Sequence, residues 1–179
     1  MLIYLSMIES EEDKSKFEML YLSYRKTMFY VANKILNDKY LSENVVHDAF
    51  LRIINNLEKI GEVKCHKTKA FIVIIVQNIA IDFYRKRKRN NTTSYDEIRL
   101  YVENIDEIEN NTDNNIEVLI LKLPIIYSSV LMLKYCQGYS NREIADILKL
   151  SEVNVRKRIS RAKQMLEIEL KNIGVDVYE

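Results

Sequence analysis

Apolar residues recur at helical spacing through the N-terminal part of the chain. Four of them predict an amphipathic helix over 12–37, namely Tyr24, Met28, Val31 and Ile35. Asn37 and Asp38 interrupt this pattern. Ser42 is the expected N-cap of a second helix, whose core face is Val46, Ala49, Phe50, Ile53 and Leu57. The stretch 59–68 carries no such stripe and is expected to be a loop.

The segment 69–89 contains the longest uninterrupted apolar run, from Phe71 to Val76. This run is rich in β-branched residues and would suit a strand by propensity. The apolar character continues to Phe83, however, and no other segment alternates well enough to be its sheet partner. We therefore predict a helix, which ends in the basic run 85–89.

Polar residues dominate from Asn90 onward. The stretch 91–114 is acidic and rich in Asn, with too little apolar surface for a core of its own, so we predict a flexible linker between domains at 12–90 and 115–172. The chain of 179 residues has only three Gly and one Pro, too few for a hairpin-rich fold. The sequence predicts an all-α protein of two small helical domains.

Local signals mark the helices of the second domain. Pro124 suits the first position of a helix over 124–136, whose expected core residues are Ile126, Val130, Leu131 and Leu133. Gly138 suits a left-handed stop, and Ser140 with Glu143 forms a capping box. The helix after this box has a core face of Ile144, Ala145 and Leu148.

Ser151 is the expected cap of the last helix, whose core stripe is Val155, Ile159, Ala162 and Leu166. Two helices joined by about three residues, the second strongly basic, predict a helix-turn-helix. The second helix of such a motif lies in the major groove of DNA. A solvated basic face on an ordinary three-helix bundle is the alternative.

The net charge of +1 conceals an uneven distribution. Residues 64–90 hold eight basic residues and one acid, whereas 91–117 hold one basic residue and eight acids. Residues 118–179 are again basic, with ten basic and seven acidic residues. Two basic zones around an acidic one favour a nucleic-acid partner. For the run 85–89, a solvated helix end or a polybasic tail for membrane or RNA remains open.

No catalytic or metal-binding constellation emerges from the sequence. Cys65 and His66 have no second pair at ligand spacing, and His47 and His66 are expected at the surface. We expect no enzymatic activity, no metal and no cofactor. The start MLIYLSMI lacks a basic leader, and no apolar run reaches the length of a membrane span, so a cytoplasmic protein is expected.

Two groups of motifs resemble a known family. The pair LP at 123–124, followed by GYSNREIADILKLSEVNVRKRISRAKQML, resembles region 4 of the sigma-70 family. LSENVVHDAFLRI and KAFIVIIVQNIAIDFYRKRKR resemble its region 2. The layout without region 3 is similar to the extracytoplasmic-function (ECF) sigma factors, over about 17–89 and 116–170. Phe71 departs from the usual Trp but would keep an aromatic wedge, and Lys149 stands where Gly is common.

The resemblance implies a transcription initiation factor that binds core RNA polymerase, promoter DNA and an anti-sigma factor. It implies polymerase contacts at Asp48 and Phe50. It implies contacts with the −10 element at Lys69, Asn78, Asp82, Arg85 and Lys86, with the loop 59–69 forming a pocket for a flipped base. The implied contacts with the −35 element are Asn154, Arg156, Lys157, Arg158, Ser160, Arg161 and Lys163.

Three other functions compete with this one. A helix-turn-helix regulator that binds an operator without polymerase would have no use for the motifs that resemble region 2. A nucleic-acid enzyme with a helix-turn-helix tail would need a catalytic cluster. A module that only docks a protein partner would not explain two separate basic zones.

Overall fold

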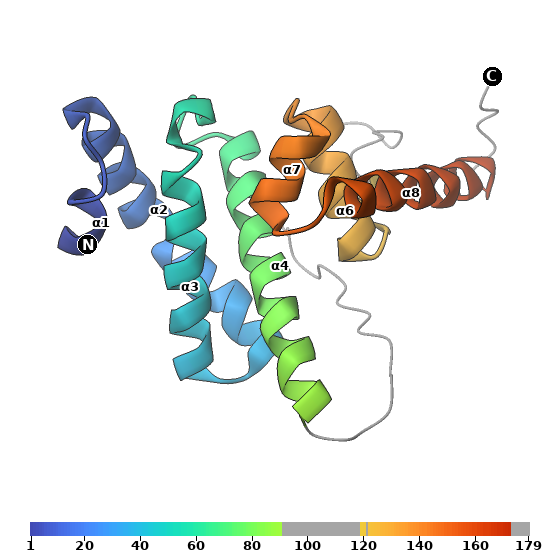
Figure 1. The fold of residues 1–179 in the computed structure, drawn as a ribbon, viewed down its shortest axis with the longest axis horizontal. Helices are drawn as coiled ribbons and strands as arrows, with labels where there is room; N and C mark the ends of the chain where they lie inside the picture. Colours follow the sequence, from blue (N-terminus) through green and yellow to red (C-terminus); the bar gives the residue numbers. More distant parts are fainter. Residues whose placement is uncertain (91–118, 121, 173–179) are drawn as a thin grey trace. The chain divides into compact units, whose positions relative to one another are not determined.

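The computed structural model describes residues 1–90, 119–120 and 122–172. The chain divides into two compact units, Met1–Tyr95 and Asp96–Glu179. Within the described ranges all regular structure is helical, which confirms the all-α prediction (Figure 1). The predicted linker 91–114 lies outside the described residues, so its flexibility stays a prediction, as do the domain bounds 12–90 and 115–172.

Three long helices form the first unit: α2 (Glu11–Leu36), α3 (Lys39–Ile54) and α4 (His66–Asn90). They pack against one another in pairs (Figure 1). The short α1 (Leu2–Leu5) packs on α3, and a 3-10 turn, η1 (Leu57–Lys59), precedes the loop that leads to α4. The largest fully buried side chains of this unit are Phe17, Leu20, Met28, Phe50, Ile53, Phe71, Ile72, Ile75 and Ile79.

The buried stripe of α2 differs from the predicted one. Tyr24 and Met28 are buried as expected, but Ala32 and Leu36 are buried in place of Val31 and Ile35, which are half-buried. After Met28 the next buried residue is four positions on, at Ala32, and not three positions on, at Val31. Both spacings keep side chains on nearly the same side of a helix, so periodicity alone did not separate them.

The start of α3 corrects the predicted cap at Ser42. Asn37 is left-handed, with φ of 48°, and ends α2, and the carboxylate of Asp38 accepts a hydrogen bond from the amide of Leu41 at 3.0 Å. Asp38 is therefore the N-cap, four residues before the predicted one. Ser42 is buried inside the helix, where its hydroxyl donates to the carbonyl of Asp38 at 2.6 Å.

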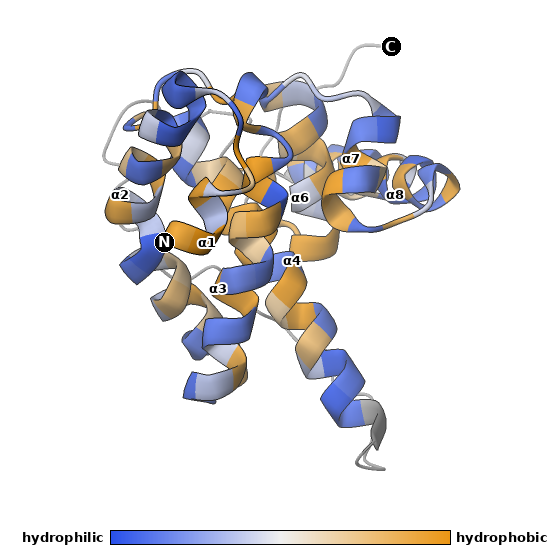
Figure 2. Ribbon diagram, turned by 60° about the vertical axis from the view of Figure 1, so that its left-hand side comes forward, coloured by the Kyte–Doolittle hydropathy of each residue, from blue (hydrophilic) through white to orange (hydrophobic). Residues whose placement is uncertain are grey.

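The helix predicted over 69–89 is confirmed as α4, and its first residues fall within the predicted loop 59–68. The carbonyl of Cys65 accepts from the amide of Lys69 at 3.1 Å, so the helix already begins at His66. Figure 2 shows hydrophobic colour along the middle of α4 and hydrophilic colour toward its C-terminal end. Phe71 is only 2% exposed, which corrects its interpretation as an aromatic wedge: it is a core residue.

The second unit contains α6 (Ile125–Leu131), the π-helical turn η2 (Met132–Cys136), α7 (Asn141–Leu148) and α8 (Glu152–Asn172). Both α6 and α7 pack on α8. Contrary to the prediction, Pro124 is the N-cap and not the first helical residue. Ile125 is buried, and Ile126 is only half-buried. Gly138 has the expected left-handed backbone, with φ of 81°.

Candidate nucleic-acid interface

Hydrogen-bonded caps fix the helix-turn-helix formed by α7 and α8. The hydroxyl of Ser140 accepts from the amide of Glu143 at 3.3 Å, and the Glu143 carboxylate accepts from the amide of Ser140 at 2.7 Å. The predicted capping box is thus complete. Lys149 ends α7 with a left-handed φ of 55°, and Ser151 accepts from the amide of Asn154 at 3.3 Å. The turn between the helices is therefore short and defined at both ends.

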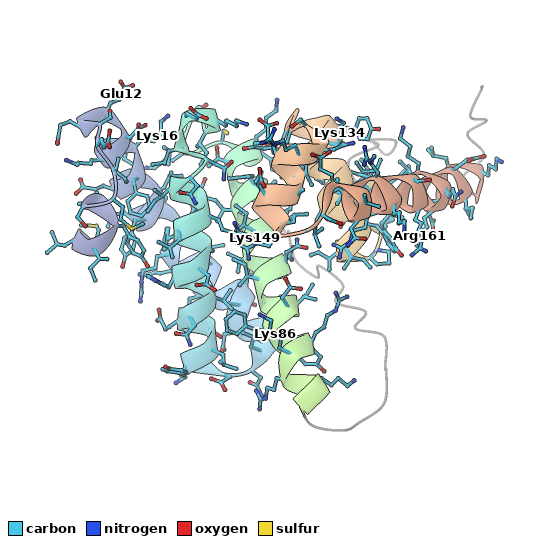
Figure 3. All side chains as sticks on the ribbon, viewed as in Figure 1. Glu12, Lys16, Lys86, Lys134, Lys149 and Arg161 are labelled. Atoms are coloured by element: carbon cyan, nitrogen blue, oxygen red, sulfur yellow. The ribbon has the colours of Figure 1, made fainter. Side chains whose placement is uncertain are left out.

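One side of α8 is buried and the other carries the cationic residues. Val155 and Ala162 are fully buried and Leu166 nearly so, whereas Ile159 is half-buried, less than predicted. Arg158 is also half-buried. The other residues expected at the −35 element are all exposed, among them Arg161, which Figure 3 labels on α8: Asn154, Arg156, Lys157, Ser160, Arg161 and Lys163.

The exposed cations of α8 are placed to meet an anion. In the part of the chain that the structure describes, neither Arg156 nor Lys157 nor Arg161 forms an ion pair with an acidic side chain. The ammonium of Lys163 lies 5.2 Å from the ring centroid of Tyr135, a cation–π contact that draws it toward η2. In its N-terminal half, the exposed face of α8 therefore carries more cations than acids, with Glu152 as the acidic residue of the first turn.

A second candidate surface in the first unit centres on the loop between η1 and α4. Several hydrogen bonds hold this loop. Among them, the ammonium of Lys16 donates to the carbonyl of Ile60 at 2.8 Å, the hydroxyl of Tyr24 to that of Val63 at 2.8 Å, and the hydroxyl of Thr68 to that of Glu62 at 2.7 Å. Sequence reasoning missed the first two, because they connect residues about forty positions apart.

An open hollow of about 650 Å³ lies between this loop and the N-terminal part of α2. Figure 3 labels Glu12 and Lys16 from the α2 side. The residues that line it are Glu12, Ser15, Lys16, Met19, Gly61, Glu62, Val63 and Lys64. Four of them fall in the loop that the sequence assigned to a flipped base of the −10 element. The hollow offers two carboxylates, two ammonium groups and apolar surface within one unit.

The residues expected at the −10 element lie along α4. Asp82, Arg85 and Lys86 are exposed, and Lys69 is half-buried. The ammonium of Lys86 lies 5.9 Å from the ring centroid of Phe83. Asn78 is only 7% exposed, and its side chain donates to the carbonyl of Ile74 at 2.8 Å, so its contact with the −10 element stays a prediction that the free chain does not display.

Phe50, the second residue expected at the polymerase, is buried in the free chain. Its side chain is 0% exposed, and its ring lies 5.0 Å from that of Tyr21 and 5.6 Å from that of Phe17, measured between centroids. Tyr4 of α1 completes this aromatic cluster and hydrogen-bonds His47 at 2.7 Å, so α1 covers part of α2 and α3. Phe50 therefore packs in the core of the free chain, beneath the surface that carries Asp48, and its part in polymerase binding stays a prediction.

Asp48 is half-buried on α3 and has a neighbour that the sequence interpretation missed. Burial lowers the pKa of Arg52, and the carboxylates of Asp82 and Asp48 counteract this by favouring its charged form. The proximity of Asp48 and Arg52 could have been predicted from the sequence, because they are four residues apart on one helix. The proximity of Asp82 to Arg52 could not have been predicted, because it depends on how α3 packs against α4.

Among the described helices, none is long and apolar enough to cross a membrane. No group of three or more His, Cys, Asp or Glu residues in the ranges 1–90, 119–120 and 122–172 is arranged to hold a metal ion.

Comparison with known proteins identifies both units. Residues 20–90 match the family model for sigma-70 region 2, and residues 113–166 match that for sigma-70, region 4. The chain is 27% identical over 160 residues to the ECF RNA polymerase sigma factor SigM of Bacillus subtilis, covering 88% of this chain and 96% of SigM. It is 26% identical over 159 residues to the ECF RNA polymerase sigma factor SigL of Mycobacterium tuberculosis, covering 87% of this chain and 89% of SigL.

A solved structure also aligns with the chain. It is the sigma factor RpoE of Bartonella quintana in complex with the anti-sigma factor NepR, at 17% identity and a TM-score of 0.40, covering 87% of this chain and 96% of that one.

The two matched regions, in the order that the sequence predicted, define the class of protein as an RNA polymerase sigma factor. The chain belongs to the sigma-70 family, and within it to the ECF type. ECF sigma factors bind core RNA polymerase and promoter DNA. The alternative of a regulator that acts on an operator without polymerase is thereby rejected.

Proposed function

We propose that this chain directs core RNA polymerase to promoters by reading a duplex −35 element with α8 and capturing the opened −10 element with α4 and the adjoining hollow. The observation that carries the proposal is the cationic face of α8, exposed opposite a buried stripe and presented by a capped helix-turn-helix. Such a face suits the phosphates and base edges of a major groove.

Within α8 we assign different roles to the cations. Arg156, Lys157 and Arg161, together with Ser160, lie on the exposed side in the N-terminal half, where a recognition helix meets base edges. An Arg that bonds two acceptors of a guanine contributes about 1–3 kcal/mol of discrimination. Arg158 and Lys163 lie toward the flanks and hold phosphates, which adds affinity without sequence information.

The proposed −10 site consists of the hollow and the exposed C-terminal part of α4. An unpaired base needs a shaped pocket, since unstacking costs about a few kcal/mol. The hydrogen bonds from Lys16 and Tyr24 keep the loop in place before DNA arrives, and Arg85 and Lys86 offer charge to the backbone of the opened strand.

Polymerase docking is assigned to the surface around Asp48, with Phe50 as its buried support. An anti-sigma factor is the proposed regulatory partner, as the resemblance to the ECF sigma factors implies. We further propose that the chain works without a cofactor, performs no catalysis of its own and acts in the cytoplasm, where core polymerase and promoters are found.

Run-off transcription tests this function. Core polymerase from the source bacterium, with and without the purified chain, is given genomic fragments, and the transcripts are sequenced to find the promoters. New transcripts that share two spaced elements are expected only when the chain is present. Binding of the chain to DNA without any effect on core polymerase would contradict the proposal.

Two matched variants then test the division of roles on α8. Arg156→Ala should change the preference at particular −35 positions, whereas Lys163→Ala should weaken all promoters alike and reduce the salt slope by about one unit. A library of −35 sequences transcribed at two salt concentrations distinguishes the two results. Equal losses across every −35 sequence for both variants would show an electrostatic patch without base reading.

A further inference from the structure

Val153 is an apolar side chain at the N-terminal end of the proposed DNA-reading face, and none of the roles assigned above uses it. It is the second residue of α8 and is 51% exposed. Residues two positions apart on an α-helix point about 200° apart, so Val153 faces away from the fully buried Val155. It continues in an exposed stripe at spacings of four, three and four residues: Val153, Lys157, Ser160 and Gln164.

This stripe is the part of α8 farthest from the core of its own unit. Single exposed apolar residues are common on protein surfaces, and exposure alone gives Val153 no role. The position of Val153 suggests a role, because the N-terminal residues of a recognition helix are the ones that contact base edges. The neighbours of Val153 on this stripe are a cation and a hydroxyl, which can meet a phosphate or a polar base edge, whereas Val153 offers only methyl groups.

The chemistry of the major groove contains one group that matches such a side chain. All four bases present hydrogen-bond donors or acceptors there, and thymine alone presents a methyl group, at C5. A valine placed against a donor or acceptor would leave that group without a partner, at a cost in affinity. A valine placed against a thymine methyl instead removes apolar surface of both groups from water.

We propose that Val153 selects an A·T pair in the −35 element through contact with the thymine methyl group. This inference rests on the proposed function, because it requires α8 to enter the major groove. It adds a base-reading residue that recognises its base without a hydrogen bond, beside the Arg residues that read by hydrogen bonding.

Deoxyuridine provides the test, because it differs from thymidine only by the missing methyl group. Duplexes bound by the holoenzyme are first selected from a random pool, and each T of the selected −35 element is then replaced in turn by dU. For the wild-type holoenzyme, replacement at one position should weaken binding about fourfold, the effect of about one buried methyl group. For Val153→Ala, the same replacement should have almost no effect.

Ile168→Ala is the matched control. Ile168 is 59% exposed on the same helix but lies in its C-terminal half, so this variant should keep the full sensitivity to dU. Val153→Ala is expected to fold normally, since the side chain is exposed and Ala is the stronger helix former. Circular dichroism of both variants checks this point.

The possible outcomes distinguish a failure of this inference from a failure of the proposed function on which it rests. A selected −35 element without T, a wild type that tolerates dU everywhere, or a Val153→Ala variant that remains as sensitive as the wild type would overturn the role of Val153 while leaving −35 recognition intact. A wild-type holoenzyme that selects no duplex at all would overturn the proposed function and this inference together.

Discussion

The substitution Tyr24→Phe removes a single hydrogen bond, the one from Tyr24 of α2 to the loop of the proposed −10 site. The Tyr24 ring is 8% exposed and its hydroxyl donates to the carbonyl of Val63 at 2.8 Å. Phe keeps the ring in the core but leaves this carbonyl without its donor. A lost buried hydrogen bond of this kind costs about 1–2 kcal/mol, which lowers the Tm of a unit of this size by about 4–16 °C.

Stability is measured by thermal and urea unfolding of the full chain, followed by circular dichroism. Tyr40→Phe serves as the control, because Tyr40 is 76% exposed and its replacement should change stability by less than about 0.5 kcal/mol. The functional assay is binding of the holoenzyme to single-stranded −10 DNA. Because Val63 lines the hollow, Tyr24→Phe should weaken this binding while binding to a −35 duplex stays unchanged.

The pH dependence gives an independent check. Burial raises the pKa of Tyr24 above its ordinary value of 10.0. A raised pKa in the folded state means that the contribution to stability is complete below about pH 10 and is lost as the pH rises through the raised pKa. Tyr24→Phe should therefore lose less stability than the wild type above pH 10. Unchanged stability and unchanged alkaline behaviour in Tyr24→Phe would refute this account of the loop.

Three further outcomes are expected. Ser140→Ala should destabilise the second unit by about 1 kcal/mol in urea unfolding, and an effect below about 0.3 kcal/mol would argue against the capping box as a determinant of α7. Asp48→Arg should lower affinity for core polymerase in a pull-down assay, and equal binding by wild type and variant would remove Asp48 from the docking surface; since its carboxylate supports the charge of Arg52, we also expect a small loss of stability. Limited proteolysis of the free protein should cut first within 91–114, and protection there equal to that of the flanking helices would contradict the predicted linker.

The sequence alone determined the features that depend on neighbouring residues. The capping box of Ser140 and Glu143 and the cap at Ser151 were predicted, because each depends on a side chain within a few positions of the backbone that it satisfies. The left-handed Gly138 was predicted because glycine lacks a Cβ. The helical character of 69–89 followed from the length of its apolar stretch. The cationic face of α8 also followed, since its buried stripe and exposed charges share one helical period.

Only the tertiary structure decided which apolar and polar residues are buried. Phe50 and Asn78 belong to motifs that resemble functional regions, yet α2, α3 and α4 enclose both side chains, and a one-dimensional pattern does not show which side of a helix its partners cover. The bonds from Lys16 and Tyr24 to the loop, and the proximity of Asp82 to Arg52, join residues far apart in the chain. They exist because the helices pack in one particular arrangement, and that arrangement follows from the whole core and not from any local segment.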